Sequence, residues 1–210
     1  VQPLVVWEDP RANRGNISRL MAEAEPAGLI VLPEMFNTGF TMDSRELAEK
    51  MDGPTVQWTQ EQARKHNAAV TGSLIISEEG RYYNRMVWTT PDGGVLWYDK
   101  RHLFTMGCEH LHYSPGHQRV TVEWKGWRIR LLVCYDLRFP VWSRNHDDYD
   151  LLIIVANWPS ARHQVWKTLP VARALENQCY GIAINRVGNA GMGLTYLGDS
   201  KMVTPKGEVT

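Results

Sequence analysis

The sequence has no excess of charge of either sign. Its 210 residues include 23 Lys and Arg and 23 Asp and Glu, so the formal net charge is zero. Without a basic excess, the chain lacks the electrostatic footprint of a protein that binds nucleic acid or an anionic membrane. No apolar run approaches the ~20 residues that a membrane-spanning helix needs. We therefore expect neither a nucleic-acid partner nor a membrane partner.

Cysteine is also scarce, with Cys108, Cys134 and Cys179 as its three positions. An odd count argues against a framework of paired disulfides. None of the three forms a C-x-x-C pair, which makes a zinc site built on thiolates an unfavoured interpretation. Free thiols are typical of a reducing compartment, so the sequence predicts a cytoplasmic protein.

No repeat, low-complexity run or linker divides the chain, and its 43% hydrophobic composition is typical of one globular domain. A hairpin is predicted around Pro91-Asp92-Gly93-Gly94. Strands are predicted at residues 4–7, 29–32, 69–76, 81–90, 95–99, 120–124, 127–133, 151–156, 180–185 and 199–203. Helices are predicted at residues 13–25 (with Asn13 as its cap), 54–67, 137–145 and 162–177, and a glycine-rich loop after residue 185. Strands and helices intermingle, so we expect one α/β domain with mixed sheets.

Three chemically distinct residues follow predicted strands. Glu34 comes after the apolar run at 29–32, Lys100 after the second hairpin strand, and Cys134 after the run at 127–133. Open α/β folds place their chemistry at strand ends. A carboxylate, an ammonium and a thiol supply a base, a charge stabiliser and a nucleophile, which together suit covalent hydrolysis of an amide or nitrile.

Each of these residues also has a purely structural interpretation when taken alone. A cysteine after a Val/Leu run is more often a core residue than a nucleophile. A glutamate after a proline can cap a turn, and a lysine before an arginine is usually solvated. None of the three residues, taken alone, therefore supports a functional assignment.

The segments around the three residues are more specific as a set. Residues 32–36 (LPEMF), 98–103 (YDKRHL) and 133–140 (VCYDLRFP) resemble the three catalytic segments of the nitrilase superfamily of carbon–nitrogen hydrolases, in the family's order. Supporting stretches are found at residues 156–159 (ANWP), 173–177 (RALEN) and 198–207. The resemblance extends from near residue 2 to the end of the chain.

This resemblance implies a four-layer α-β-β-α sandwich that dimerises. It implies Glu34 as the base, Lys100 as the stabiliser and Cys134 as the nucleophile. Glu109 matches a second glutamate that is often found after the family's lysine. We treat residues 1–210 as a single carbon–nitrogen hydrolase domain. Its first strand and its C-terminal extension are expected to be shortened relative to the family pattern.

The finer resemblance is to the omega-amidase branch, through residues 34–42 (EMFNTGFTM), 100–104 (KRHLF) and 141–145 (VWSRN). It implies hydrolysis of the distal amide of 2-oxo acids such as 2-oxoglutaramate and 2-oxosuccinamate, through a cysteine thioester. The expected partners are this small amide, water and a second copy of the chain. The expected chemistry needs no metal or other cofactor.

Substrate-contacting residues follow from the chemistry of that substrate. Lys100 and the backbone N–H of Tyr135 are candidates to hold the oxyanion of a tetrahedral intermediate. The carboxylate of a 2-oxo acid needs a cation, for which Arg138 is the first candidate, although a salt bridge to Asp136 is an equal alternative. Phe40 and Trp158 are candidates for an apolar wall, or equally for the core.

The same residues are compatible with other functions. His102, His110, His112 and His117 raise the alternative of a metal hydrolase. N-carbamoyl amino acid hydrolysis, aliphatic amide hydrolysis and nitrile hydrolysis use the same nucleophile chemistry. A non-catalytic binding module on the same fold is a further alternative, but the joint presence of Glu34, Lys100 and Cys134 argues against it.

Overall fold

Two β-sheets carry the architecture in the computed structural model, which describes residues 1–210 apart from the side chain of Met192. The first sheet has the order β1 (Leu29–Val31), β2 (Ala69–Glu78), β3 (Arg81–Thr89) and β4 (Val95–Asp99). The second has the order β11 (Lys201–Val203), β8 (Tyr180–Ile184), β7 (Leu151–Val155), β6 (Trp127–Val133) and β5 (Thr121–Trp124). Strands β6, β7 and β8 pair in parallel, as do β1 and β2, whereas the hairpins pair antiparallel. Strands β11 and β8 also pair antiparallel, so both sheets are mixed, as the sequence predicts.

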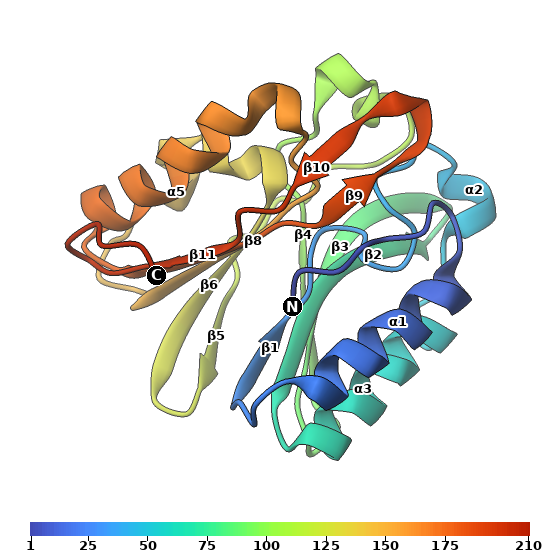
Figure 1. Ribbon diagram of the computed structural model, residues 1–210, viewed down its shortest axis with the longest axis horizontal. Helices are drawn as coiled ribbons and strands as arrows, with labels where there is room; N and C mark the ends of the chain where they lie inside the picture. Colours follow the sequence, from blue (N-terminus) through green and yellow to red (C-terminus); the bar gives the residue numbers. More distant parts are fainter.

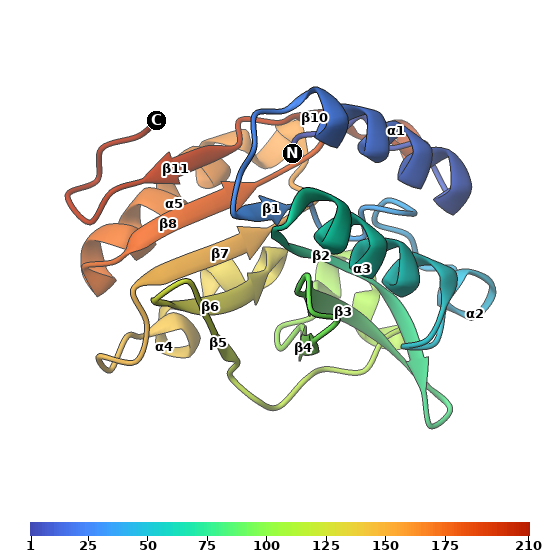
Figure 2. The same ribbon diagram turned by 90° about the horizontal axis from the view of Figure 1, so that it is seen from below.

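Helices cover the outer faces of both sheets. Figures 1 and 2 show α1 (Pro10–Glu23) and α3 (Pro54–His66) on one side, and α5 (His163–Asn177) on the other. A hydrophobic cluster joins α1 and α3 to the first sheet, and another joins α5 to the second. A third lies between the sheets. The chain therefore forms the expected four-layer α-β-β-α sandwich.

Strand β6 shows how the sequence builds these layers. Successive side chains of a strand point to opposite faces. Leu131 and Val133 accordingly enter the core between the sheets, while Leu132 enters the core beneath α5. A strand buried on both faces reads as a continuous apolar run, which is why residues 131–133 show no polar alternation.

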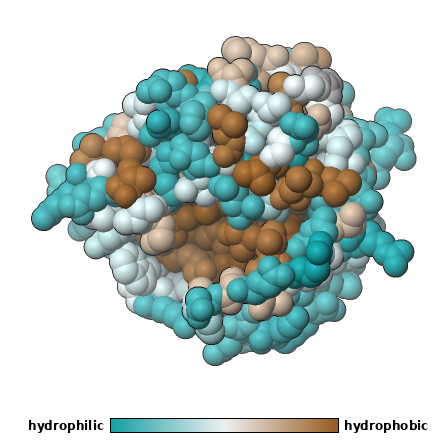
Figure 3. Space-filling view, viewed as in Figure 1, coloured by the Kyte–Doolittle hydropathy of each residue, from teal (hydrophilic) through white to brown (hydrophobic). Residues whose placement is uncertain are grey.

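The core between the sheets reaches the surface on one face. Leu29, Ile182 and Ile184 pack against it but are only partly buried. In the space-filling view of Figure 3, hydrophobic residues line a hollow between β1 and the edge formed by β8 and β11. The two sheets thus diverge on this face of the molecule.

Several local predictions are corrected by the structure. Helix α1 begins at Pro10 and is capped by Asp9, whose carboxylate accepts the N–H of Ala12. Asn13 lies inside the helix and bonds Val6 and Asn37 instead. Its amide fixes a neighbouring loop, a tertiary role that local pattern does not reveal.

Three further segments differ from their predicted forms. The predicted helix at 137–145 is divided into η3 (Cys134–Arg138) and α4 (Pro140–Ser143), because Pro140 starts a new helical turn. The glycine-rich loop contains the hairpin of β9 (Val187–Asn189) and β10 (Thr195–Leu197). The predicted strand at 4–7 retains a single bridge, from Leu4 to Val187.

The remaining elements are short. They are α2 (Ser44–Leu47), η1 (Thr105–Gly107), η2 (Glu109–Leu111), η4 (Ser160–Arg162) and η5 (Gly191–Gly193). Within the described residues, no helix combines the length and the apolar character that crossing a membrane requires.

Candidate active site

Three strand ends bring the predicted residues to one place. Glu34 follows β1, Lys100 follows β4 and Cys134 follows β6 directly. The side chains of Glu34 and Lys100 are fully buried, and the ammonium Nζ lies 2.9 Å from Oε1 of Glu34. The structural interpretation of Lys100 as a solvated residue is therefore wrong.

Glu109 completes a buried charge cluster, by which we mean Glu34, Lys100 and Glu109. It begins η2, and both of its carboxylate oxygens lie 2.9 Å from Nζ of Lys100. Its Oε2 also accepts the backbone N–H of Phe104 at 2.5 Å. The loop after the lysine thus folds back so that a second carboxylate shares the same ammonium.

The charges in this cluster shift the pKa values of its members. Burial alone would lower the pKa of Lys100, but the negative charges of Glu109 and Glu34 outweigh it and raise that pKa. Burial, followed by the charge of Glu34, raises the pKa of Glu109. Two carboxylates face one ammonium, so the cluster holds the cation firmly and carries excess negative charge when both carboxylates are ionised.

Cys134 stands at a strained turn beside this cluster. It begins η3 with φ of 46°, in the left-handed region that residues other than glycine rarely adopt. Its half-buried side chain lines the same cavity as Glu34. Burial, and then the negative charge of Glu34, raise the pKa of the Cys134 thiol, while Lys100 opposes the rise. At neutral pH the resting cysteine is therefore a thiol that needs a proton acceptor.

Asp136 holds this turn in place from within the core. Its carboxylate accepts the N–H of Val133 at 3.1 Å, the hydroxyl of Tyr98 at 2.7 Å and the N–H of His102 at 2.9 Å. It also contacts the His102 ring at 2.8 Å. The alternative that Arg138 forms a salt bridge with Asp136 is therefore wrong, since the partner of Asp136 is His102.

Two asparagines at the site were not singled out from the sequence. The backbone N–H of Asn157, just after β7, donates to Oε2 of Glu34 at 2.8 Å, and its side chain donates to the Glu34 carbonyl. Asn84, inside β3, donates to Oε1 of Glu34 at 2.8 Å. A polar residue directly after the apolar run at 151–156 was a usable signal for Asn157. The strand pattern around Asn84 held none.

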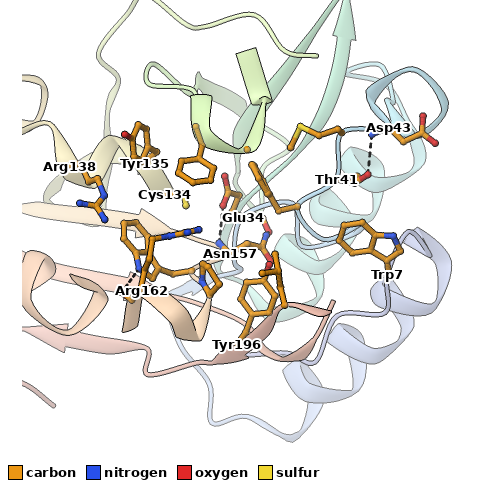
Figure 4. Close-up of a pocket in the computed structure, with 17 residues that line it drawn as sticks. Trp7, Glu34, Thr41, Asp43, Cys134, Tyr135, Arg138, Asn157, Arg162 and Tyr196 are labelled. Atoms are coloured by element: carbon orange, nitrogen blue, oxygen red, sulfur yellow. Dashed lines mark hydrogen bonds between the residues drawn. The ribbon is translucent and has the colours of Figure 1, made fainter. Parts of the chain in front are cut away.

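A cavity of about 300 Å³ opens above Glu34 and Cys134. Its walls are mostly aromatic and apolar, and they come from segments far apart in the sequence: Trp7, Phe40, Met42, Phe104, Tyr135, Trp158, Leu194 and Tyr196. Figure 4 shows Cys134, Glu34 and Asn157 in the middle of the cavity, with Trp7 and Asp43 toward one end. The volume suits a small substrate.

The candidate wall residues have double roles. Trp158 lines the cavity, yet it is 4% exposed and stacks on Trp166 in the core beneath α5. Phe40 also lines the cavity, and its ring centre lies 5.2 Å from Nζ of Lys100. The predicted alternatives of wall and core are thus both realised for Trp158.

Two arginines form what we call the arginine rim, consisting of Arg138 and Arg162. Arg138 is exposed and lies over the Trp158 ring at 5.6 Å. Arg162 is half-buried and lies over the Phe104 ring at 4.8 Å. Both line the cavity at the end away from Trp7 (Figure 4). Within the described part of the chain, neither guanidinium forms a salt bridge. Arg162 was missed from the sequence because it was assigned only to a helix.

The oxyanion candidate Tyr135 belongs to the first turn of η3. The N–H groups of a first turn have no acceptor within their own helix. The Tyr135 ring packs edge-on against Phe104 and Phe139. Its backbone amide directly follows Cys134 in the chain, and the aromatic contacts of the ring hold the residue in place.

The histidines do not assemble into one site. His102 stacks on Phe139 and contacts Asp136, whereas His117 contacts Arg101. Among the described residues, no group of three or more His, Cys, Asp or Glu side chains is arranged to hold a metal ion.

Comparisons with known proteins agree with this architecture. The family model for carbon-nitrogen hydrolases matches residues 1–210. Omega-amidase YafV of Escherichia coli (strain K12) is 49% identical over 208 residues, which cover 99% of this chain and 80% of that protein. The 2-oxoglutaramate amidase of Bacillus subtilis (strain 168) is 35% identical over 192 residues, covering 89% and 74%. A CN-hydrolase superfamily protein from Xanthomonas campestris, solved with an arsenic adduct in its active site, superposes with a TM-score of 0.97 at 48% identity. That superposition covers 100% of this chain and 83% of the other.

Proposed function

Because this chain belongs to the carbon–nitrogen hydrolase family and is an amide-hydrolysing enzyme, we propose that it releases ammonia from the distal amide of 2-oxo acid amides. The expected substrates are 2-oxoglutaramate and 2-oxosuccinamate. The observation that carries the proposal is the pairing of a thiol and a buried carboxylate in a small cavity that also holds two free guanidinium groups.

The first half of the reaction forms a thioester. Glu34 takes the proton of the Cys134 thiol while Sγ bonds to the amide carbon, and the carbonyl electrons move onto oxygen. Lys100 and the N–H of Tyr135 stabilise that oxyanion. Lys100 already donates to Glu34 and to both oxygens of Glu109, so it frees an N–H by releasing one Glu109 bond. The C–N bond then breaks, and the proton on Glu34 leaves with ammonia.

The second half consumes water. Glu34, ionised again, takes a proton from a water molecule whose oxygen attacks the thioester carbon. The C–S bond breaks, the proton returns to sulfur, and the 2-oxo dicarboxylate departs. A thioester intermediate replaces one high barrier by two lower ones, and it predicts ping-pong kinetics with ammonia as the first product.

Recognition of the substrate's own carboxylate falls to the arginine rim. A guanidinium binds a carboxylate through two parallel N–H bonds, which fixes orientation as well as charge. Arg138 lies four residues after Cys134, and Arg162 lies along the same end of the cavity. Phe40, Phe104 and Trp158 leave the short carbon chain between the amide and the carboxylate in apolar surroundings.

The aromatic walls also favour a second candidate, a simple aliphatic amide without a carboxylate. The test is therefore ammonia release from 2-oxoglutaramate and from butyramide, with the Cys134→Ala variant as the blank. Loss of a charge-assisted contact costs about 10- to 100-fold in kcat/KM, so the carboxylate substrate should exceed butyramide by at least this factor. Equal values for the two amides would contradict the 2-oxo acid assignment and favour the aliphatic amide.

A further inference from the structure

Asn84 contacts both carboxylates of the buried charge cluster. Its amide nitrogen Nδ2 lies 2.8 Å from Oε1 of Glu34 and 3.2 Å from Oε1 of Glu109. The residue is fully buried in the middle of β3, and it lies outside the set that lines the cavity. A side-chain amide has two N–H donors, so Asn84 supplies one hydrogen to each glutamate.

The orientation of this amide is dictated by Ser73. The Ser73 hydroxyl oxygen accepts the backbone N–H of Met35 at 2.9 Å, and the hydroxyl lies 2.7 Å from Oδ1 of Asn84. Its single hydrogen therefore goes to Oδ1, which leaves Nδ2 facing the glutamates. A rotated amide would instead place its oxygen against two carboxylates. A continuous chain of donors thus runs from Met35 through Ser73 and Asn84 to the cluster.

The donors around Glu34 are distributed unevenly between its two oxygens. Oε1 accepts from Nζ of Lys100 at 2.9 Å and from Asn84, which occupies both of its acceptor sites. Among the described residues, Oε2 accepts only from the backbone N–H of Asn157. One acceptor site of Oε2 therefore remains for an incoming proton.

We propose that Asn84, oriented by Ser73, is a positioning residue that keeps Oε1 of Glu34 occupied and directs the proton of the Cys134 thiol to Oε2. In the same contact it gives Glu109 a neutral donor, so the two carboxylates remain ionised around one ammonium. The inference rests on the proposed function for its reaction, because Glu34 acts there as the proton acceptor. Asn84 itself touches neither the thiol nor the substrate.

Removing the Asn84 amide has a defined electrostatic consequence. The groups that face it are Glu34, Glu109 and Lys100, and Cys134 and Tyr113 feel the same charges. Hydrogen bonds to an ionised carboxylate favour the ionised form. Without them, the pKa of Glu109, which burial already raises, rises further, so the cluster takes up a proton at higher pH. The acid limb of the rate profile should therefore move to higher pH.

The main experiment compares wild type, Asn84→Ala and Ser73→Ala in kcat and KM for 2-oxoglutaramate across pH. Displacement of a reacting group by about 1 Å costs about 100-fold in rate. We expect Asn84→Ala to lower kcat about 100-fold, to change KM less than about 3-fold, and to move the acid limb upward. Ser73→Ala frees the amide to rotate and also removes the acceptor of the Met35 N–H. It should lower kcat and move the acid limb in the same directions, each by less.

A second readout needs no substrate. The rate at which iodoacetamide alkylates Cys134 is followed by mass spectrometry of its peptide, which separates it from the exposed Cys108. Asn84→Ala should move the pH dependence of this rate in the same direction as the acid limb. If wild type fails to release ammonia from any 2-oxo acid amide, the proposed function fails, while the alkylation profile still tests Asn84.

Asn177 provides a matched control, because it is a buried asparagine that bonds Asn145 and the Arg173 carbonyl. Asn177→Ala should lower thermal stability and leave both pH profiles unchanged. If folded Asn84→Ala shows the same pH profiles of rate and alkylation as wild type, the proposal is overturned. Should Asn84→Ala not fold, unchanged profiles in Ser73→Ala would overturn it equally.

Discussion

The buried charge cluster and the arginine rim lie at the same cavity but are held in opposite ways. In the cluster, Lys100 donates to two carboxylates, and Glu34 also accepts from Asn84 and Asn157. The rim guanidinium groups of Arg138 and Arg162 instead lie over aromatic rings. The cluster is thus defined by many mutual hydrogen bonds, and the rim by a few stacking contacts.

This difference suits the cluster to the reaction and the rim to substrate binding. A proton acceptor must sit within hydrogen-bond reach of its proton, so its surroundings have to leave it a single position. A group that binds the far end of a substrate tolerates more freedom, and an unpaired guanidinium remains available to a carboxylate from solution. Substitutions in the cluster should therefore affect kcat and folding, whereas substitutions in the rim should affect KM.

The largest effect is expected from Cys134→Ala. Removal of the nucleophile leaves no route to the thioester, so kcat should fall at least about 10⁴-fold. The side chain is half-buried and small, so the thermal midpoint should change by only a few degrees. Ammonia release and thermal unfolding check both statements, and Cys108→Ser is the matched control at an exposed thiol. Amidase activity above 1% of wild type in Cys134→Ala would contradict the assignment.

The next effect is on stability, through Lys100→Met. The substitution leaves Glu34 and Glu109 buried without their cation, and breaking a buried ion pair costs about 3–5 kcal/mol. Burial already raises the pKa of Glu109, and loss of the ammonium raises it further. The folded variant then binds more protons than the unfolded chain as pH falls. The loss in free energy of unfolding relative to wild type should therefore shrink from pH 7 toward pH 4.

Urea unfolding at several pH values measures that deficit. Lys206→Met, at an exposed lysine, serves as the control and should stay within about 0.5 kcal/mol of wild type. A pH-independent deficit in Lys100→Met would mean that the carboxylates find other compensation.

The two regions also differ in how far the sequence predicts them. The four layers follow from apolar runs such as residues 127–133, whose side chains fill two cores at once. The meeting of Glu34, Lys100 and Glu109 follows from segments that resemble a known family. Asn84 and Ser73 escaped notice because they sit inside strands, where a polar residue signals only local pairing. Their role depends on which strands neighbour each other, which is a property of the tertiary fold.

At the rim, Arg162→Ala and Arg138→Ala should each raise KM for 2-oxoglutaramate by about 10-fold or more, with kcat less affected. Arg162 should show the larger effect, because it is half-buried while Arg138 is exposed. Butyramide, which lacks a carboxylate, should be hydrolysed by both variants as by wild type. Arg119→Ala, at an exposed arginine outside this cavity, is the control. Equal losses for the two substrates would show that the rim supports the fold instead of the carboxylate.

The smallest effect is expected from Phe40→Leu, at a cavity residue outside both sets that lies close to the cluster. Its ring lines the cavity and lies 5.2 Å from Nζ of Lys100. A cation–π contact contributes about 0.5–1 kcal/mol at exposed sites and about 2 kcal/mol when desolvated. Phe40 is half-buried, so a loss of about 1 kcal/mol should lower kcat/KM about 5-fold. Phe40→Tyr keeps the ring and serves as the matched control. If the loss in Phe40→Leu falls on kcat, the ring acts through Lys100 and belongs with the cluster. If it falls on KM alone, the ring acts on the substrate's carbon chain. Phe40 then contributes to substrate binding, as the rim does, and not to the reaction.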